Sequence, residues 1–446
     1  MFVEQAPSMN ELLERLSGDE VLAAIRASAD GRSGGRYLHW DKLKRLEPPA
    51  GLTVEQWWLK LKMTRADELR PIPLTDPDGA PFSYGRLDTM DRSLHHIDQR
   101  CSGEVAMDEV VTSEKLAGGR FLVNSLMEEA IRSSQLEGAS TSQRAAKEML
   151  QSGRKPRDRS ERMIANNYRA LQFMRDEMGE SLNPDAILEL HRIVTENTLK
   201  DPAAAGRMQL ADEERVAVFD RDDGEPIHKP PPAEQLPERM RLMCDFANQG
   251  EEDEPFIHPV IRAILLHFWL AYDHPFLDGN GRTARILFFW LMRQRGYWLA
   301  EYLPISRFIR AAPSQYARAF VEVETDGGDI TYFLIHQLQV IERAIDDLHV
   351  YLQRKVAEVR DMERLIQGTV YLNGRQLALL TDSIRHPDLT HSFESHASNH
   401  RVSHETARTD LHQLENRGLL VQRRKGRKHI FEPAPDLAER LKESPA

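Results

Sequence analysis

The sequence predicts a mainly α-helical protein with one short β-hairpin in its middle and a small carboxyl-terminal domain in which helices precede a second hairpin. Three observations support this class. Apolar residues recur at intervals of three and four along most of the chain, the period of a helix packed on one side. Alternating stretches are short, near residues 216–218 and after residue 419, and turn residues follow them. The length of 446 residues suits two or three domains with separate cores.

Composition limits the classes of protein that need to be considered. The 41% hydrophobic and 29% charged residues are ordinary for a globular protein, and acidic residues interrupt the first thirty positions. No apolar run nears twenty residues, so we expect neither a signal peptide nor a membrane partner, and a cytoplasmic location. Cys101 and Cys244 lack CxxC spacing and are expected to be reduced core residues. The net charge of -11 argues against a nucleic-acid coat over the whole chain.

Residues 1–105 are interpreted as an accessory region. They mix short helical runs, MNELLERL and DEVLAAIRA, with an aromatic stretch whose side chains we expect to lie in a core. Prolines interrupt the helical pattern and predict a loop-like segment after it; they are Pro71, Pro73, Pro77 and Pro81.

The helix expected over residues 120–138 has one unusual face. Leu126, Ala130, Ser133 and Glu137 follow a helical spacing, so the face begins apolar and ends in a carboxylate. Gly138 is well suited to end this helix. A carboxylate on such a face is unfavourable unless a cation meets it, and a structural salt bridge is the simplest explanation.

The middle of the chain then alternates between helices and one hairpin. Asn183 and Pro184 are typical of a helix start. Residues 215–232 contain a DDG turn and end in three prolines, which predicts a short β-hairpin or flap. Helices are expected over residues 236–248 and 259–272, and the second is apolar nearly all round and therefore central.

The stretch HPFLDGNGRTAR, residues 274–285, carries the chemistry. A helix should begin near Gly281, which places DGNG at a helix amino terminus, where free N–H groups and the helix dipole bind anions. Arg282 and Arg285 lie in the first turn and can reach the same anion. The spacing and the lysine of a Walker-type loop are absent. So many donors indicate a chain of phosphates rather than one.

Two further residues of this stretch suggest a reaction. Asp278 offers a hard oxygen ligand of the kind that holds magnesium against phosphate oxygens. His274 precedes it by four residues and is suited to remove a proton from an incoming hydroxyl. Pro275 and Phe276 are interpreted as structural. Together these residues indicate transfer of a phosphorus-centred group to a hydroxyl.

The same stretch resembles a known family at every defined position. It matches the Fic signature HPFx[DE]GNGRxxR, and its surroundings, including SSQLEG, HKPPP and GDITYFLIHQLQVIE, are similar over roughly residues 115–345. The resemblance implies a Fic-type helical core, assigned here to residues 106–345, with the hairpin as a flap that aligns a target segment. It also implies a protein adenylyltransferase that uses ATP and Mg²⁺ to transfer AMP to a Ser, Thr or Tyr hydroxyl of a target protein or of itself, releasing pyrophosphate.

The resemblance also implies a role for each site residue. His274 is the implied general base and Asp278 the implied magnesium ligand. The implied nucleotide-binding residues are Gly279, Asn280, Gly281, Arg282 and Arg285. Of these, the DGNG glycines and asparagine would form the anion hole, with the asparagine also touching the α-phosphate. The first arginine would hold the β-phosphate region and the second the γ-phosphate.

An inhibitory motif is suggested upstream. Ser133, Glu137 and Gly138 fit the pattern [ST]xxxE[GN] of Fic proteins that restrain themselves. The implied partner of Glu137 is Arg285, whose occupation would prevent productive seating of the γ-phosphate. An alternative is that Glu137 positions water to remove AMP from modified targets, and the sequence leaves both open.

Residues 346–446 resemble a linker helix followed by a winged-helix domain. Asn373 and Gln376 form an expected capping box, Ser403 is expected to cap a helix, and residues 419–422 and 429–432 are expected to pair across the turn at Lys425 and Gly426. Residues 401–430 carry eight Lys or Arg against three Asp or Glu. Domains of this kind bind DNA, dock on other proteins or form homodimers.

Two functions therefore compete at this level. One is an AMP-transferring enzyme whose terminal regions select the target. The other is a DNA-binding transcriptional regulator in which the Fic core senses nucleotide. His274 favours the enzyme, because nucleotide sensing requires the anion site and not a base.

Overall fold

The computed structural model describes residues 3–27, 36–101, 120–216, 218–219, 226–250, 252–367, 372–385, 390–425, 428–437 and 440. The protein is mainly α-helical with small two-stranded antiparallel sheets, as the sequence predicts. It forms two compact units, the first of residues 1–105 and 122–346 and the second of residues 106–121 and 347–446. Within the described ranges, no helix is both long and apolar enough to cross a bilayer.

The amino-terminal residues of the first unit build a small aromatic core. The elements are α1 Met9–Arg15, α2 Gly18–Arg26, α3 Trp40–Leu43 and α4 Val54–Ala66. Capping boxes from Ser8 and Ser17 start the first two helices. Trp57 and Trp58 are buried in this core, which confirms that the aromatic stretch is interior.

The proline-rich segment that follows is a β-hairpin, so the prediction of a loop is wrong. Strands β1 Leu69–Thr75 and β2 Pro81–Gly85 pair antiparallel, with Pro71 opposite Ser83. The backbone of Ser83 bonds away from β1, to the Gly328 carbonyl and the Ile330 N–H, so the missing N–H of Pro71 removes no bond between the two strands. Ile72 and Leu74 alternate into the core and hold the hairpin in place.

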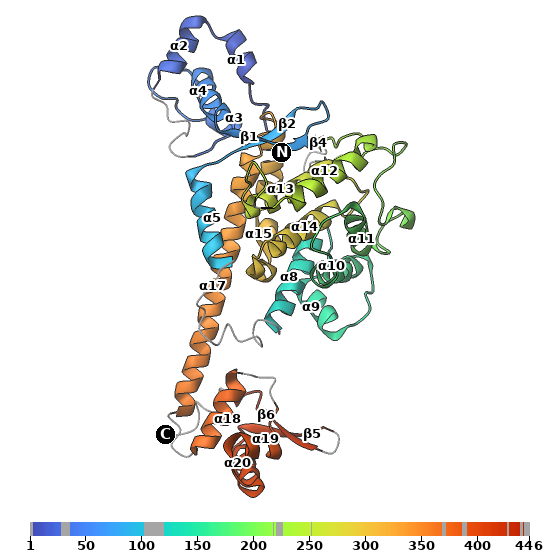
Figure 1. Ribbon diagram of the computed structural model, residues 1–446, viewed down its shortest axis with the longest axis vertical. Coiled ribbons are helices and arrows are strands. Elements are labelled where there is room, and N and C mark those ends of the chain that lie inside the picture. The colour runs from blue at the N-terminus through green and yellow to red at the C-terminus, as the bar shows by residue number, and fades with distance from the viewer. Residues whose placement is uncertain are drawn as a thin grey trace. The chain divides into compact units, whose positions relative to one another are not determined.

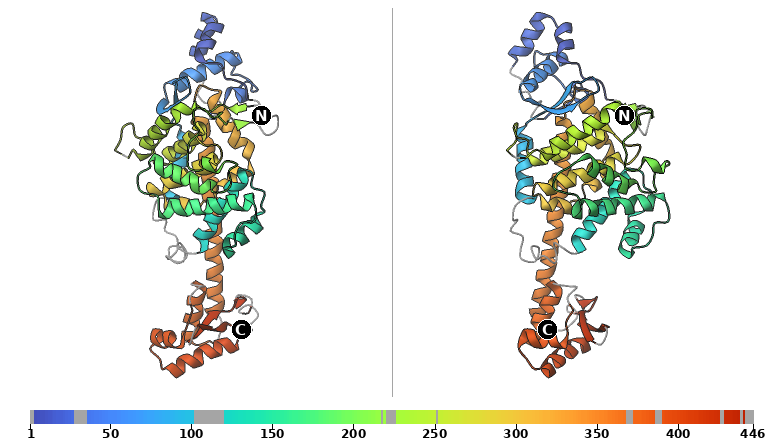
Figure 2. Two further views of the ribbon diagram at one scale, coloured as in Figure 1. Left: turned by 90° about the vertical axis from the view of Figure 1, so that its right-hand side faces the viewer. Right: turned by 45° about the vertical axis from the view of Figure 1, so that its right-hand side comes forward.

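The helix after the hairpin lies along the longest helix of the chain. Helix α5, Asp88–Cys101, lies beside the first half of α17, Thr331–Gln367, as the views in Figure 1 and Figure 2 show. An Arg100–Asp346 ion pair joins them at 2.5 Å. Helix α17 begins at Thr331, so the expected linker helix near residue 346 is the continuation of a core helix and not a separate element.

The remaining elements of the first unit surround two central helices. They are α8 Arg120–Leu136, α9 Gln143–Ser152, α10 Arg159–Asp176, α11 Pro184–Thr195, β3 Val218–Phe219, β4 Pro226–His228, α12 Leu236–Asn248, α13 Pro259–Asp273, α14 Asn280–Gln294, α15 Ile305–Ala311 and α16 Pro313–Glu324, with short 3₁₀ turns at Pro202–Ala204, Ala233–Gln235 and Trp298–Tyr302. All residues of α13 except Ala271 are buried, as its apolar pattern predicts. Helices α13 and α14 occupy the middle of this unit, with α8, α10 and α11 beside them (Figure 1).

The flap is present as a hairpin. Val218 pairs with His228 and Phe219 with Pro226 in an antiparallel ladder. The DDG turn of the prediction lies outside the described residues. Cys101 and Cys244 are free and buried, as expected.

The second unit contains α18 Gly374–Arg385, α19 Phe393–His400, α20 His404–Asn416, β5 Leu420–Lys425 and β6 Lys428–Pro433. The expected Asn373 and Gln376 capping box forms, with Gln376 N–H donating to Asn373 Oδ1 at 3.0 Å. Ser403 caps α20 through the Thr406 N–H. Phe431 of β6 is fully buried and packs with leucines from the helices. The Gly426 turn lies outside the described residues, and the winged-helix assignment stays a prediction.

Candidate active site

The HPFLDGNGRTAR stretch forms the loop between α13 and α14. His274 ends α13 with φ 46°, and Gly279 precedes α14 with φ 92°. Both residues lie in the left-handed region, which turns the chain sharply so that α14 begins at Asn280, one residue before the predicted start. The free N–H groups of the first turn of α14 therefore face the loop.

Backbone carbonyls of the loop are held from outside. Arg215 Nη2 donates to the carbonyls of Asp273 and His274 at 2.7 and 3.2 Å. The Gln209 N–H donates to the Pro275 carbonyl at 2.8 Å. These contacts come from the segment between α11 and the flap, so the loop is shaped by a neighbouring segment as well as by its own glycines.

Asn280 holds the loop with its side chain. Its Oδ1 accepts from the Phe276 N–H at 2.9 Å, and its Nδ2 donates to the Phe276 carbonyl at 2.7 Å. The Asn280 side chain is buried and both of its polar atoms are used. The Asn280 side chain therefore serves to shape the loop, and its backbone N–H lies at the start of α14.

His274 is a neutral, half-buried imidazole. Loss of water around the ring, followed by the nearby positive charge of His228, lowers the pKa of His274 to about 4. The Nδ1 atom lies 3.4 Å from the Ala271 carbonyl, so a proton on Nδ1 leaves Nε2 as a lone-pair acceptor. The ring is thus in the form that a general base requires at neutral pH.

The carboxylate of Asp278 lies between two guanidinium groups. Arg282 Nη2 donates to Oδ1 at 3.1 Å, and Arg159 Nη2 donates to Oδ2 at 2.9 Å. Arg159 is the first residue of α10 and its side chain is 58% exposed. Arg159 is not predictable as a site residue, because no local pattern links α10 to a loop 119 residues away.

Arg282 is fully buried beneath the loop. Besides the contact with Asp278, its Nη1 donates to the Val194 carbonyl at 3.2 Å. Its Nε has no hydrogen-bond partner among the described residues. A buried donor without a partner is unfavourable, so this guanidinium has capacity for a further acceptor in the site.

Arg285 binds the end of α8. Its Nε donates to Ser133 Oγ at 2.9 Å and its Nη2 to the Ser133 carbonyl at 3.2 Å. The same Nη2 donates to Glu137 Oε1 at 2.7 Å. Glu137 directly follows α8, and Gly138 turns the chain away with φ 97°. The pairing of Glu137 with Arg285 that the resemblance implies is therefore present as a contact.

The Glu137 carboxylate also lies on the amino terminus of α14. A Cβ atom added at Gly281 would overlap Glu137 Oε1 and would lie 3.1 Å from Arg285 Nη1. Glu137 is 28% exposed at this position, whereas Arg285 is almost fully buried. A carboxylate thus occupies the place where the sequence predicts an anion, which shows that the chemistry of this helix start suits negative charge.

The flap contacts the same loop region through His228. Its Nδ1 lies 2.9 Å from Glu324 Oε2 and its Nε2 lies 2.6 Å from the Tyr272 carbonyl. The hairpin is therefore anchored at the end of α13, just before His274. The predicted site residues lie on α8, in the turn that directly follows it, on α14 and in the loop between α13 and α14.

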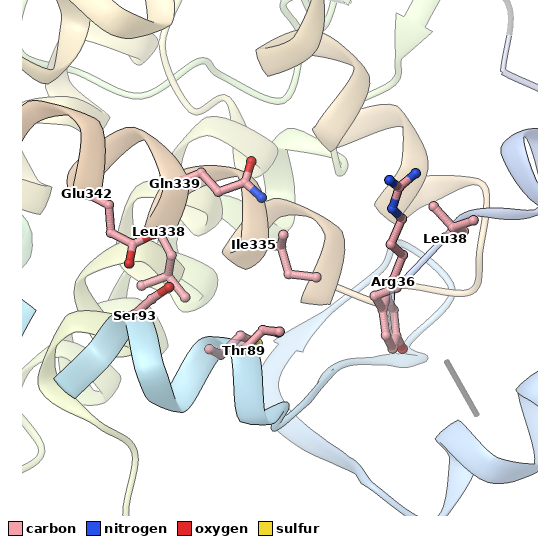
Figure 3. Close-up of a pocket in the computed structure, with 10 residues that line it drawn as sticks. Arg36, Leu38, Thr89, Ser93, Ile335, Leu338, Gln339 and Glu342 are labelled. Carbon is pink, nitrogen blue, oxygen red and sulfur yellow. The ribbon is translucent and has the colours of Figure 1, made fainter. Parts of the chain in front are cut away.

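A separate cavity of about 380 Å³ lies between α5 and α17 (Figure 3). Its lining includes Met90 and Ser93 of α5 and Leu338 and Glu342 of α17. None of the predicted site residues lines it, although Arg36 contributes a guanidinium group to its wall. The geometry of the loop, and not this cavity, defines the candidate site.

The fold and the site define a helical domain in which a helix start suited to negative charge lies beside a neutral histidine. Residues 181–292 match the sequence model of the Fic/DOC family. This part of the chain is therefore a Fic domain, as the resemblance of the motif indicated.

Known proteins are similar over the same region. Protein adenylyltransferase Fic of Nematostella vectensis is 36% identical over 119 residues, which is 27% of this chain and 25% of that protein. Protein adenylyltransferase fic-1 of Caenorhabditis elegans is 35% identical over 118 residues, 26% of this chain and 20% of that protein. The matches thus span a quarter or less of these relatives.

One solved structure supports the fold. A Fic family protein from Desulfovibrio desulfuricans G20 superposes with a TM-score of 0.52 at 17% identity, covering 82% of this chain and 98% of that chain. At this identity the likeness concerns the fold alone.

Proposed function

We propose that the protein is a Mg²⁺-dependent protein adenylyltransferase that transfers AMP from ATP to a Ser, Thr or Tyr hydroxyl of a target protein or of itself. The observation that supports it most is the Glu137 carboxylate, which lies on the α14 amino terminus and pairs with Arg285. A triphosphate offers the same negative charge to the same donors. The names of the relatives that match this region support the choice of AMP as the transferred group.

The phosphate chain would be held by groups already in place. The N–H groups at the start of α14 would donate to one phosphate, and the unpartnered Nε of Arg282 lies buried nearby. Arg285 would bind the far end of the chain once Glu137 leaves it. Asp278 would hold the magnesium ion, which supplies positive charge to the phosphate oxygens when bound.

His274 supplies the proton acceptor for the transfer. The target hydroxyl oxygen bonds to the α-phosphorus, and the bond from that phosphorus to the oxygen of the β-phosphate breaks. The hydroxyl proton passes to Nε2 of His274, and pyrophosphate leaves. Because the pKa of His274 is lowered to about 4, the ring is unprotonated before the reaction begins.

Glu137 restrains this reaction in the proposal. While it occupies Arg285, the distal phosphate lacks its cationic partner and the α-phosphate is not aligned for attack. The enzyme therefore idles until the contact opens. The alternative, in which Glu137 positions a water molecule that removes AMP from modified targets, uses the same location of the carboxylate.

Transfer of label from α-³²P ATP tests the proposal. We expect more labelled protein with Glu137→Gly than with the wild type, and none when His274→Ala is added. Glu137→Gln should give an intermediate gain. Glu128→Gln is the matched control, because Glu128 is on the same helix but lies near Arg132 and Arg307. Absence of labelling in Glu137→Gly, or equal labelling after His274→Ala, would contradict the proposal.

A second candidate function uses the second unit. His404, Arg408 and Thr409 are exposed on α20, and Arg424 is exposed on β5, which is the surface expected of a DNA-reading helix and its neighbouring strand. A DNA-binding regulator with a nucleotide-sensing core would bind duplex DNA with an affinity that ATP changes, and His274→Ala would leave this response intact. Fluorescence anisotropy with labelled duplexes separates it from the enzyme.

A further inference from the structure

We propose that His191 is a positioning residue that sets the direction of the Gly279 N–H group in the phosphate-binding loop. The inference rests on the proposed function, because it names a residue that shapes the same site. His191 lies on α11, and the sequence analysis assigned it no role. Its side chain is fully buried and contacts no solvent.

Both nitrogens of the His191 ring have backbone partners. The Gly206 N–H donates to Nδ1 at 3.1 Å, which leaves Nδ1 without a proton in the neutral ring. The proton therefore lies on Nε2, which donates to the Asp278 carbonyl at 2.9 Å. The ring also stacks on Phe276 with centroids 3.8 Å apart and planes 7° from parallel. Its orientation and its tautomer are thus both determined by the surrounding chain.

The carbonyl that His191 holds belongs to the peptide between Asp278 and Gly279. In a planar trans peptide the C=O and N–H bonds point in opposite directions. Holding the carbonyl against α11 therefore turns the Gly279 N–H away from α11 and toward the loop interior. A glycine on one side of this peptide makes a flip easy, because glycine accepts both signs of φ. His191 supplies the contact that opposes such a flip.

Thr195, also on α11, packs against the same loop. Its Oγ1 donates to the His191 carbonyl at 2.7 Å, and its methyl group faces Gly279. A Cβ atom at Gly279 would lie 2.8 Å from Thr195 Cγ2 and 3.4 Å from the His191 ring. The loop thus packs so tightly on α11 that glycine is required there, and the position of α11 determines where the loop N–H groups lie.

The role of His191 is to orient the loop and not to exchange protons. Because the Gly206 N–H donates to Nδ1, the ring offers a single N–H donor, on Nε2, and that donor is used by the Asp278 carbonyl. Loss of one oriented donor to a developing oxyanion lowers kcat on the order of 100-fold. We expect a loss of that kind when the Asp278 carbonyl is released, with little change in KM for the target protein.

Two substitutions separate orientation from packing. In His191→Gln the side-chain amide nitrogen replaces Nε2 and can still donate to the Asp278 carbonyl. In His191→Asn the side-chain oxygen replaces Nδ1 and can still accept from Gly206, but the donor to Asp278 is lost. Both variants lose the stack on Phe276 and so share that defect.

The variants are compared in full-length Glu137→Gly protein with labelled ATP and with ADP titrated by calorimetry. We expect the Asn variant to lose on the order of 100-fold in kcat and the Gln variant to keep most of it. ADP should bind more weakly to the Asn variant. Equal kcat and equal ADP affinity in the two variants would overturn the inference. If the Glu137→Gly parent transfers no AMP, the proposed function fails, and the ADP titration still decides the role of His191.

If both variants fail to fold, the wild-type protein supplies the answer. Nitrogen-15 NMR of histidine-labelled protein reports which ring nitrogen carries the proton. We expect the proton of His191 on Nε2 at pH 7.5. A proton on Nδ1 would show that the Asp278 carbonyl is not held by this ring and would overturn the inference.

Discussion

Glu129 should make the stability of the protein depend on pH in a direction that is unusual for a carboxylate. It lies on α8, two turns before Glu137, and its carboxylate is buried against α15. The Ser306 N–H donates to Oε2 at 3.0 Å, and the Ser306 hydroxyl also donates to this carboxylate. Burial raises the pKa of Glu129 from 4.5 to about 7, although the two hydrogen bonds oppose that rise.

The sign of the effect follows from proton binding. Between pH 4.5 and 7 the folded protein holds a proton on Glu129 that the unfolded chain has lost. Stability therefore falls as the pH rises through this window, and the contribution is fully present only below pH 4.5. A difference of this size corresponds to about 3 kcal/mol, since one pKa unit is worth about 1.4 kcal/mol.

The assay compares the wild type with Glu129→Gln. Urea unfolding is followed at several pH values from 5 to 8, and only the difference between the two proteins is used, so that other titrating groups cancel. Glutamine does not ionise, so the free energy of unfolding of Glu129→Gln relative to the wild type should rise by about 3 kcal/mol across the window. A difference that stays constant with pH would refute the reasoning. Glu128→Gln, on the same helix but partly exposed, is the control.

Two further variants test other contacts of the site. Gly138→Ala places a side chain at φ 97°, which costs roughly 1 kcal/mol of local stability. This strain should loosen the contact of Glu137, so AMP labelling should rise. Gly138→Asn should raise labelling less, because asparagine tolerates positive φ better. No gain in labelling would contradict the link between this turn and inhibition. Arg159→Ala removes one of the two guanidinium groups on Asp278, so Mn²⁺ should bind at lower concentration when followed by electron paramagnetic resonance. The control is Arg162→Ala, whose contact is with the Asn197 carbonyl, and an unchanged Mn²⁺ titration in Arg159→Ala would refute competition at Asp278.

Much of the candidate site could be predicted because its parts are local. The start of α14, the left-handed Gly279 and the turn at Gly138 depend on residues within a few positions, where glycine and helix periodicity act directly. The same holds for the caps of α11 and α20, which form where Asn183 and Ser403 predict them.

Two errors of the sequence prediction have different causes. The β1–β2 hairpin was missed because prolines disfavour strands in general, whereas here Ser83, opposite Pro71, bonds to Gly328 and Ile330 instead of to the proline. The helix that begins at Thr331 continues past residue 346. The predicted division at that residue was wrong because no helix-breaking residue lies there.

The sequence alone determined the helical class and the glycine-rich start of α14, because backbone N–H groups and glycine conformations are set by near neighbours, whereas the contact of Glu137 with Arg285 was implied by the resemblance to the Fic family. Only the tertiary structure decided how these residues are held. Arg159 contacts Asp278, which is 119 positions away in the sequence. His191 contacts the Asp278 carbonyl at a separation of 87 positions, and Ser306 contacts Glu129 at a separation of 177. Contacts of this kind depend on how whole helices pack, and no spacing in the sequence encodes that packing.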